Sequence, residues 1–414
     1  MKKHLLLAAC LSWAATQAQQ IQRCSSHEYQ QQILSDYPEY QAVIDDGNNH
    51  AQEYAQNHPQ GYSPRATVVI PVVFHVVYAN ATENISTTRL MEQLQVLNED
   101  YGKYNADAGN VPTAFQGLHA NTDIQFCLAH KDPNGNWTDG IERTSTTVSS
   151  FSTNDNVKFA SSGGADAWPA DDYLNIWVCD LGSSLLGYAA FPGGPANRDG
   201  VVLHYRYTGK TGASAPFNKG RTATHEVGHW LGLRHIWGDD GSSCSGSDLV
   251  SDTPNQASEN YGCFTVGQVR TDACTANAPG IMWMNFMDYT DDACMYMFTT
   301  GQKTRMWSFL NGARVAILGS QQCLVGFEEQ ALAARINLFP SPNDGLFNLQ
   351  FNGLLLNDVT ITITNSVGQI VEMRYYDIVH DTQLSFDMSQ QPQGVYIIDI
   401  TTSNERIIKK MIKQ

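Results

Sequence analysis

Basic side chains are scarce in this sequence: 25 Lys and Arg stand against 41 Asp and Glu, and the formal net charge is −16. An acidic surface repels the phosphate backbone, so the composition argues against nucleic acid as a partner. It fits a protein that binds cations or acts on basic substrates, although solubility alone would explain it equally well. The 414 residues exceed what one compact core needs, so we expect two or three folded units.

Long apolar runs are also missing beyond the N-terminus. Lys2 and Lys3 precede an apolar stretch, Leu5 to Ala15, that is too short to cross a membrane. Thr16-Gln17-Ala18 follows with small residues at the positions that a signal peptidase requires. We therefore expect a signal peptide at residues 1–18, no transmembrane segment, and a mature chain that is secreted or attached to the cell surface.

Cysteine is not scarce. Of nine cysteines, Cys10 leaves with the signal peptide, and the other eight enter an oxidising space where disulfides are expected. Four of them crowd into one irregular stretch, which indicates local cross-linking: Cys244, Cys263, Cys274 and Cys294. Their spacing does not decide which cysteine pairs with which.

The residue composition of the chain changes twice, first near Ala66 and again at Ile336. Residues 19–64 are rich in Gln, Asn, Tyr and His and indicate a propeptide with some helix. Ala66 to Tyr78 is a β-branched run that predicts a buried strand, with Pro71 at a bulge or a sheet edge. Further strands are expected at Asp123–Ala129, Tyr173–Cys179, Leu186–Phe191 and Val201–Tyr205, and helices at Ser86–Tyr104, Lys219–Leu231 and Gly301–Asn311, with Thr299 or Thr300 as the cap of the last. This order predicts an α/β (α+β) domain with a twisted mixed sheet over residues 65–325.

A region with a third kind of composition begins at Ile336. Thr360 to Thr364 alternates between polar and apolar residues, and Val395 to Ile400 reads as another strand. Short strands separated by turns predict an all-β sandwich over residues 330–414.

The most informative segment is HEVGHWLGLRH, residues 225–235. His225 and His229 are four residues apart, so on a helix they project from one face and can reach one metal ion. Gly232 is free to take a positive φ, ends the helix, and lets His235 return to the metal. Three protein ligands leave the fourth position of a zinc ion open, which is typical of a catalytic site. Glu226, beside the first ligand, then serves as the general base that takes a proton from water.

HExxHxxGxxH resembles the metzincin clan of metallopeptidases, and together with NFMDYTDDAC (residues 285–294) it resembles the bacterial members of the pappalysin family over roughly Ala66 to Asn311. The resemblance implies a secreted zinc endopeptidase with an active-site helix. Met287 would be the hydrophobic floor beneath the zinc. Tyr289 would be the phenol that hydrogen-bonds the oxyanion; the alternative is a buried aromatic residue.

The same resemblance implies how a protein substrate binds. Gly187, Tyr188 and Ala189 lie in a segment similar to the family's upper-rim strand, which pairs with an extended peptide, although ordinary sheet membership would leave the same sequence. Asp292 would line the pocket for the residue after the cut and select Arg or Lys. The alternatives for Asp292 are a solvated acidic loop and a calcium ligand.

Calcium and disulfides are also implied. The loop from Asp239 to Cys263 is rich in acidic residues, Gly and Ser, which suits calcium, and the candidate ligands are Asp248, Asp252 and Thr253. The resemblance implies the disulfides Cys244–Cys274 and Cys263–Cys294.

Cys24, just after the signal peptide, resembles the family's propeptide cysteine, which binds the zinc of the zymogen and makes the propeptide an inhibitor of its own enzyme. Ser25 stands where family members often have Gly. The alternative is a disulfide with Cys127, Cys179 or Cys323. The active form is expected to begin near Arg65, released by the enzyme itself or by a trypsin-like protease.

Residues 339–345 (FPSPNDG), with Gly368-Gln369, Gly394-Val395-Tyr396 and a late Lys409-Lys410, resemble the sorting domain of the bacterial type IX secretion route. Such a domain binds the secretion machinery and addresses the enzyme to the cell surface or beyond. Two other functions remain open from the residues: a non-catalytic, zinc-containing adhesin, and a metalloenzyme that acts on a non-peptide bond.

Overall fold

The computed structural model describes residues 21–59, 61–64, 66–182, 184–323, 335–380, 382–402 and 406–414. The predicted signal peptide and Arg65 lie outside these ranges. The chain divides into two units, one with the chain up to Leu128 and Gly140–Gly319, the other with Ala129–Asp139 and Ser320–Gln414. The boundaries predicted at 18/19, 64/65 and 325/330 stay predictions. Within the described ranges, none of the helices combines the length and apolar character that a membrane crossing requires.

The first unit is built on a six-stranded sheet in the order β2-β1-β4-β6-β5, with β3 also pairing with β1. All pairs are parallel except that of β5, the edge strand, which runs antiparallel to β6. The predicted mixed sheet is therefore confirmed. Its strands are β1 (Val68–Tyr78), β2 (Ile124–Leu128), β3 (Ile141–Ser145), β4 (Leu174–Cys179), β5 (Gly187–Ala189) and β6 (Val201–His204).

Strand β1 is the centre of this sheet. Its residues from Ile70 to Val77 are buried, because a parallel strand covered on both faces needs a continuous apolar run. Pro71 pairs with Cys127 of β2, whereas the pairing with β4 begins only at Val72. The proline therefore lies where β1 has no β4 partner, a position that resembles a sheet edge.

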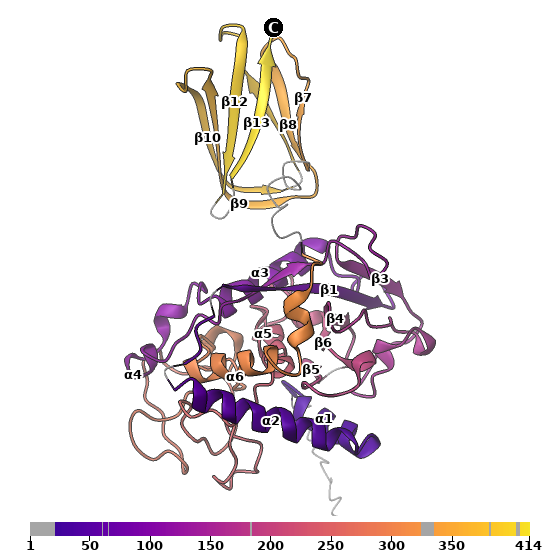
Figure 1. Ribbon diagram of the computed structural model, residues 1–414, viewed down its shortest axis with the longest axis vertical. Helices are drawn as coiled ribbons and strands as arrows, with labels where there is room; N and C mark the ends of the chain where they lie inside the picture. Colours follow the sequence, from indigo (N-terminus) through magenta and orange to yellow (C-terminus); the bar gives the residue numbers. More distant parts are fainter. Residues whose placement is uncertain are drawn as a thin grey trace, which may run out of the picture. The chain divides into compact units, whose positions relative to one another are not determined.

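Two helices position the site against the sheet. Helix α3 (Thr87–Tyr101) starts after Ser86, whose side chain accepts a hydrogen bond from the Arg89 amide, and it buries Leu90, Leu94 and Leu97. Helix α5 (Arg221–Trp230) packs against α3, β5 and β6 (Figure 1). Every residue of α5 is buried, so the histidines it carries sit in the interior of the unit.

Helix α6 (Thr300–Leu310) closes the unit. Thr299 caps it in a reciprocal capping box with Gln302, in agreement with the expected start. The remaining short elements are η1 (Ala108–Asn110), α4 (Thr113–Gln116), η2 (Asn156–Lys158), η3 (Ala160–Ser162), η4 (Ala196–Arg198), η5 (Tyr205–Tyr207), η6 (Asp292–Cys294) and η7 (Val315–Gly319).

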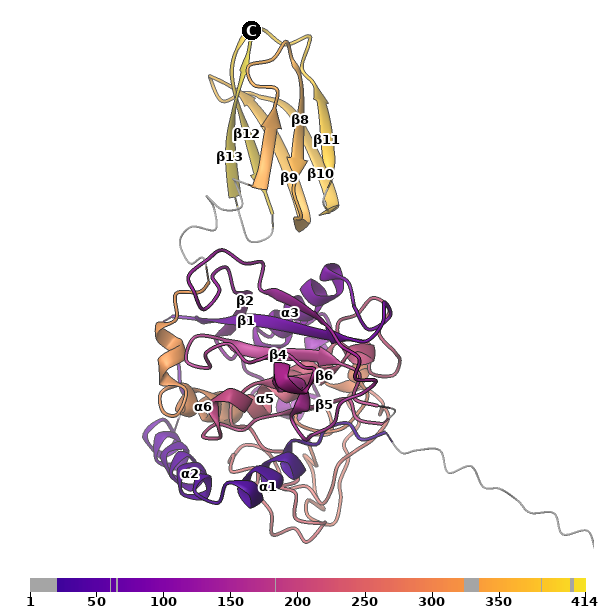
Figure 2. The ribbon, with the colours of Figure 1, turned by 90° about the vertical axis from the view of Figure 1, so that its right-hand side faces the viewer.

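The segment predicted as a propeptide forms two helices, α1 (Ser26–Asp36) and α2 (Tyr40–Asn57). Helix α1 contacts β5, and α2 lies along α6 (Figure 2). Ala51 is the one buried residue of α2, so this helix lies on the surface of the unit instead of contributing to its core.

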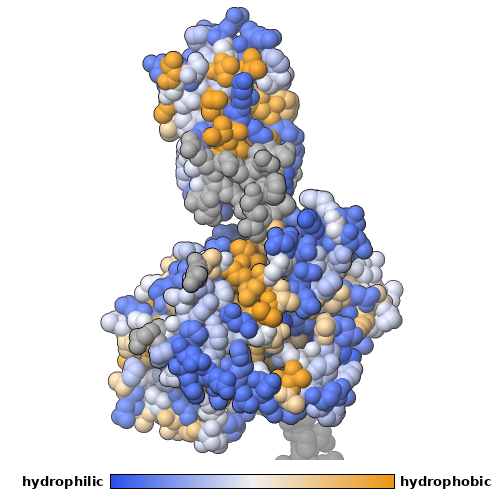
Figure 3. All heavy atoms as spheres, viewed as in Figure 1, coloured by the Kyte–Doolittle hydropathy of each residue, from blue (hydrophilic) through white to orange (hydrophobic). Residues whose placement is uncertain are grey.

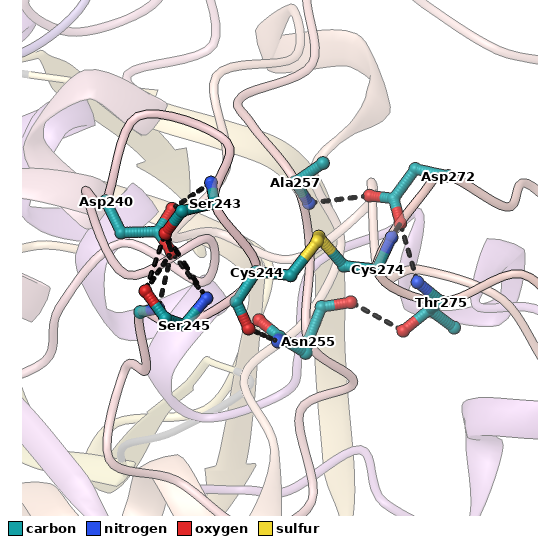
Figure 4. Close-up of a disulfide and its surroundings, with 10 residues drawn as sticks. Asp240, Ser243, Cys244, Ser245, Asn255, Ala257, Asp272, Cys274 and Thr275 are labelled. Carbon is teal, nitrogen blue, oxygen red and sulfur yellow. Dashed lines mark hydrogen bonds between the residues drawn. A yellow bond between two sulfur atoms is a disulfide. The ribbon is translucent and has the colours of Figure 1, made fainter.

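The stretch between Trp237 and Thr299 has little regular structure and is cross-linked instead. Cys244 is joined to Cys274, with the carboxylate of Asp240 and that of Asp272 binding backbone amides on either side (Figure 4). Cys263 is joined to Cys294, so both bridges have the pairing that the family resemblance implies.

The other cysteines differ in state. Cys127 and Cys323 are also disulfide-bonded. Cys24 and Cys179 are free and buried. A disulfide at Cys24, the alternative left open by the sequence, is therefore wrong.

The second unit contains two antiparallel sheets, in the orders β10-β9-β12-β13 and β11-β8-β7. In β9 the alternation predicted around Thr360–Thr364 buries Val359, Ile361 and Ile363 in the core of the unit. Several apolar residues remain exposed among polar ones on its visible face (Figure 3). Its strands are β7 (Ile336–Phe339), β8 (Leu346–Phe351), β9 (Leu355–Asn365), β10 (Ile370–His380), β11 (Gln383–Asp387), β12 (Gly394–Thr401) and β13 (Arg406–Lys413).

Candidate active site

Three histidines converge at the end of α5. His225 and His229 project from one face of the helix, and the chain then turns at Gly232, whose φ is +89°, so that His235 returns to them. Nε2 of His229 lies 3.0 Å from Nε2 of His225 and 3.1 Å from Nε2 of His235. The spacing of the sequence segment and the sharp turn at glycine therefore bring the three rings to one point.

The hydrogen bonds made by the Nδ1 atoms show that the Nε2 atoms are the ones that face the point where the rings converge. Nδ1 of His225 lies 2.7 Å from the carbonyl oxygen of Phe286, and Nδ1 of His229 lies 2.8 Å from that of Leu233. A carbonyl oxygen can only accept, so both Nδ1 atoms carry the proton and both Nε2 atoms present a lone pair. Burial lowers the pKa of both rings well below the usual value, which keeps them neutral. Nδ1 of His235 likewise faces an oxygen, Oδ1 of Asp239, at 2.7 Å.

Lone pairs that face one another repel unless a cation lies between them, so the three rings fit a metal ion. Cys24 completes the set: its sulfur and the ring nitrogens of the three histidines all lie within 4.8 Å of one another. Among the described residues this is the one group of His, Cys, Asp and Glu that could hold a metal ion. Imidazole and thiolate are ligands that zinc favours, whereas calcium and magnesium favour oxygen.

Glu226 points into the same space. It is fully buried, and burial raises its pKa to about 7. Its Oε2 accepts hydrogen bonds from the Ser26 hydroxyl at 2.7 Å and from the Cys24 thiol at 3.3 Å. No described residue hydrogen-bonds Oε1. Burial also raises the pKa of the Cys24 thiol, and the nearby Glu226 carboxylate adds to this effect.

The segment predicted as a methionine turn contacts α5 and the histidine rings. Met287 is fully buried, and its sulfur would lie 2.5 Å from a Cβ atom added at Gly228, so only glycine fits at that position of α5. The hydroxyl of Tyr289 donates to the carbonyl oxygen of Cys24 at 3.3 Å. Its ring lies against the rings of His225 and His235, with centroids 5.6 Å and 5.0 Å away.

Asp292 is fully buried, so the idea of a solvated acidic loop does not fit it. Its Oδ2 accepts from the backbone amides of Lys219 and Arg221, at 2.8 Å and 3.2 Å. Its Oδ1 pairs with the guanidinium of Arg23 at 2.9 Å. The Arg23 side chain, 1% exposed, also lies over the ring of Phe217. The carboxylate thus forms the floor of an enclosed pocket that holds a cation.

The rim strand β5 holds the chain around Cys24. Gln22 forms a parallel bridge with Leu185, and the amide of Ser25 donates to the carbonyl of Gly187 at 3.2 Å. The amide of Ala189 donates to the Ser26 hydroxyl at 2.8 Å. A Cβ at Gly187 would meet the side chain of Glu226 at 3.0 Å, so the rim approaches the site closely. The side chain of Tyr188 points elsewhere, to Asp155.

The candidate calcium ligands are held by hydrogen bonds. Asp248 accepts from the hydroxyl of Thr253 at 2.7 Å. Asp252 accepts from the hydroxyl of Thr299 at 2.6 Å and from the amide of Gly301 at 2.8 Å, so both its oxygens face the start of α6. Calcium at these residues stays a prediction.

Three residues of the site were not singled out from the sequence: Arg23, Ser26 and Asp239. Arg23 and Ser26 flank Cys24 closely in sequence, and an arginine beside the cysteine is the signal that could have been used, given the acidic pocket expected at Asp292. Asp239 lies four residues after His235, and in the sequence it is one of several carboxylates of the acidic loop.

Known proteins match both units. The family profile of peptidase family M43, described as pregnancy-associated plasma protein-A, matches residues 159–311, and that of the secretion system C-terminal sorting domain matches residues 337–414. An extracellular metalloprotease of Colletotrichum graminicola is 35% identical over 264 residues, which are 61% of this chain and 80% of that protein. Extracellular metalloprotease 1 of Coccidioides posadasii is 34% identical over 59% of this chain and 77% of its own length.

Two solved structures are more similar still. Mature mirolysin of Tannerella forsythia, in complex with a cleaved peptide, is 55% identical with a TM-score of 0.61, over 62% of this chain and 97% of that chain. A promirolysin mutant of the same organism is 50% identical with a TM-score of 0.66, over 71% of this chain and 96% of that chain.

Proposed function

This chain belongs to the pappalysin family of secreted metalloproteases, and from that premise we propose that it is a zinc endopeptidase that cuts before Arg or Lys. We propose further that residues 19–64 hold it latent. A type IX sorting domain follows the protease and directs its secretion.

One observation carries the proposal. The sulfur of Cys24 faces the three converging histidine nitrogens while its neighbour, Arg23, fills the acidic pocket of Asp292. A thiol at the metal and a cation in the pocket beside it together imitate a bound substrate. This arrangement supports both the zinc site and the preference for a basic residue after the cut.

His225, His229 and His235 would hold the zinc, with Cys24 as the fourth ligand of the latent form. When bound, zinc would supply Lewis acidity, which polarises a substrate carbonyl and acidifies water. Glu226 takes the proton from the attacking water and passes it to the leaving amine, since its carboxylate lies buried at the centre of the site.

Tyr289 stabilises the oxyanion. Its hydroxyl already donates to a backbone carbonyl, that of Cys24, at the point where a substrate carbonyl would lie. Gly187, Tyr188 and Ala189 offer the backbone of an edge strand, and the Gly187 carbonyl and Ala189 amide, which bind the propeptide in the latent form, pair with an extended peptide once it leaves. Met287 packs beneath α5 and fixes the helix that carries the histidines.

The propeptide escapes cleavage because its chain runs through the site in the direction opposite to that of a substrate. In a substrate, the carbonyl that is attacked precedes the residue whose side chain enters the Asp292 pocket. In the propeptide, the residue at the histidines, Cys24, follows the residue in the pocket, Arg23. No peptide carbonyl is therefore presented in the cleavable orientation. Ser25 has a φ of −129°, so the turn after Cys24 does not need glycine.

A calcium ion at Asp248, Asp252 and Thr253 remains part of the proposal, supported by the acidic, irregular loop in which they lie.

The adhesin alternative would need the histidine site without proteolysis, and Glu226, buried with one oxygen unpaired, argues against it. A panel of acyl substrates beside peptides tests the remaining alternative, a non-peptide bond.

Asp292→Asn is expected to lower kcat/KM for a peptide with Arg after the cut by about 10- to 100-fold, because a charge-assisted hydrogen bond to the guanidinium is lost. The amide keeps one oxygen for the Lys219 and Arg221 backbone amides. A matched peptide with Leu after the cut is expected to be cleaved at an unchanged rate. Equal losses on both peptides would mean that Asp292 only supports the fold.

A further inference from the structure

We propose that the mature enzyme has a subsite for a tyrosine side chain on the N-terminal side of the cut, lined by Asp155, Lys158 and Tyr188. In the latent form, Tyr29 of the propeptide fills it. The inference rests on the proposed peptidase function and adds a second point of substrate selection to the pocket of Asp292.

The Tyr29 side chain is enclosed and hydrogen-bonded in the way that a ligand is held in a binding site. Its side chain is 2% exposed although it belongs to a segment that must leave. Its hydroxyl donates to Asp155 Oδ2 at 2.7 Å and accepts from Lys158 Nζ at 3.2 Å. Its ring packs against that of Tyr188, with centroids 4.9 Å apart, and Lys158 Nζ lies 4.7 Å from the ring centre. Both polar capacities of the phenol and its aromatic face are therefore used.

The residues that form the walls of this pocket also bind one another. Asp155 forms ion pairs with Lys158 at 2.9 Å and Arg198 at 2.7 Å, and it accepts from the hydroxyl of Tyr188 at 3.2 Å. Lys158 Nζ also donates to the carbonyl of Arg198 at 2.7 Å. All four residues follow the predicted activation site, so these contacts remain available when Tyr29 departs, whereas the contact of Arg198 with Tyr37 is lost.

The charged side chains in this aromatic pocket indicate that it selects a side chain with a hydroxyl group. Asp155 and Lys158 are both fully buried, and burying a charged pair costs free energy that packing alone would not require. An apolar pocket would accept phenylalanine as well as tyrosine. A pocket that offers one acceptor and one donor to a hydroxyl discriminates against the ring that lacks it.

The direction of the propeptide shows where a substrate residue would enter. Because the propeptide runs opposite to a substrate, the residues after Cys24 overlie those before the cut. Four residues separate Cys24 from Tyr29: Ser25 precedes helix α1 and the other three belong to it, so the path is at most about 11 Å. An extended substrate covers this path in about three residues. We therefore expect the subsite to read the third or fourth residue before the cut.

The test uses purified mature enzyme and fluorogenic peptides with Arg after the cut and Ala elsewhere. Tyr, Phe or Ala is placed in turn at the second to the sixth position before the cut. Tyr at the third or fourth position is expected to raise kcat/KM about tenfold over Ala, mainly through KM, with Phe giving a smaller gain. Equal rates for Tyr and Ala at every position would overturn the subsite.

Lys158→Met provides the matching change in the enzyme, with Lys210→Met, at a half-buried ion pair with Glu99, as its control. Lys158→Met is expected to abolish the advantage of Tyr over Phe, measured as the ratio of kcat/KM values for the two peptides, and a retained advantage would contradict the proposal. If this variant fails to fold, the peptide series with the wild-type enzyme decides alone. Cleavage of the all-Ala peptide without a tyrosine preference overturns the subsite but not the peptidase, whereas no cleavage of any peptide overturns both.

Discussion

Glu226→Gln is expected to lower kcat/KM of the mature enzyme for peptide hydrolysis by about 10²- to 10⁴-fold, the usual contribution of a general base. Glutamine has the same size but cannot take a proton, and the carboxylate it replaces lies fully buried beside the three histidines. The zinc content of the protein is expected to stay at one ion per chain, because Glu226 is not among the four residues whose ligand atoms converge.

Steady-state rates on a peptide with Arg after the cut and elemental analysis of the same preparations check this result. Glu99→Gln, at a half-buried ion pair with Lys210, is the matched control and should retain full activity. A Glu226→Gln protein that still cuts peptides at the wild-type rate would remove the general base from the mechanism. Loss of zinc together with activity would show instead that the substitution disturbs the metal site.

Cys24→Ala in the full-length chain is expected to raise peptidase activity of the uncleaved protein at least about tenfold, since losing even 1.4 kcal/mol of propeptide binding shifts the equilibrium by that factor. Among the described propeptide residues, Cys24 is the one His, Cys, Asp or Glu whose ligand atom groups with the three histidines. Arg23 and Ser26 keep their own contacts with Asp292 and Glu226, so latency is weakened and not abolished.

Initial rates must be recorded while mass spectrometry shows the chain intact, since propeptide loss would also raise activity. Cys179→Ala is the matched control, because Cys179 is likewise free and buried but lies in β4 of the central sheet. A Cys24→Ala chain as inactive as the wild-type precursor would mean that Arg23 and Ser26 alone maintain latency.

Local signals made much of this structure predictable. The strand at β1 follows from its unbroken β-branched run, and the start of α6 follows from the Thr299 cap. The convergence of His225, His229 and His235 follows from helical spacing and one glycine. Each of these features depends on residues close together in sequence, whose conformation is decided by neighbours.

Other features depend on contacts that no local pattern encodes. Arg23 meets Asp292 across 269 positions of sequence, and Tyr29 meets Asp155 across 126. Strand β3 (Ile141–Ser145) is not marked in the sequence, because the four residues after Ile141 are polar and none of the five is buried, so there is no apolar alternation. The Tyr29 pocket combines an aromatic ring with buried charges from distant loops, which only the folded chain brings together.

Mapping the cuts that the purified mature protein makes in a proteome-derived peptide library tests the zinc peptidase most directly. Chelator-treated enzyme and the Glu226→Gln variant serve as controls. We expect chelator-sensitive cuts that cluster before Arg and Lys and that vanish in the variant. Cuts without a basic preference would contradict the role of Asp292, and no cuts by a zinc-loaded protein free of residues 19–64 would contradict the peptidase itself.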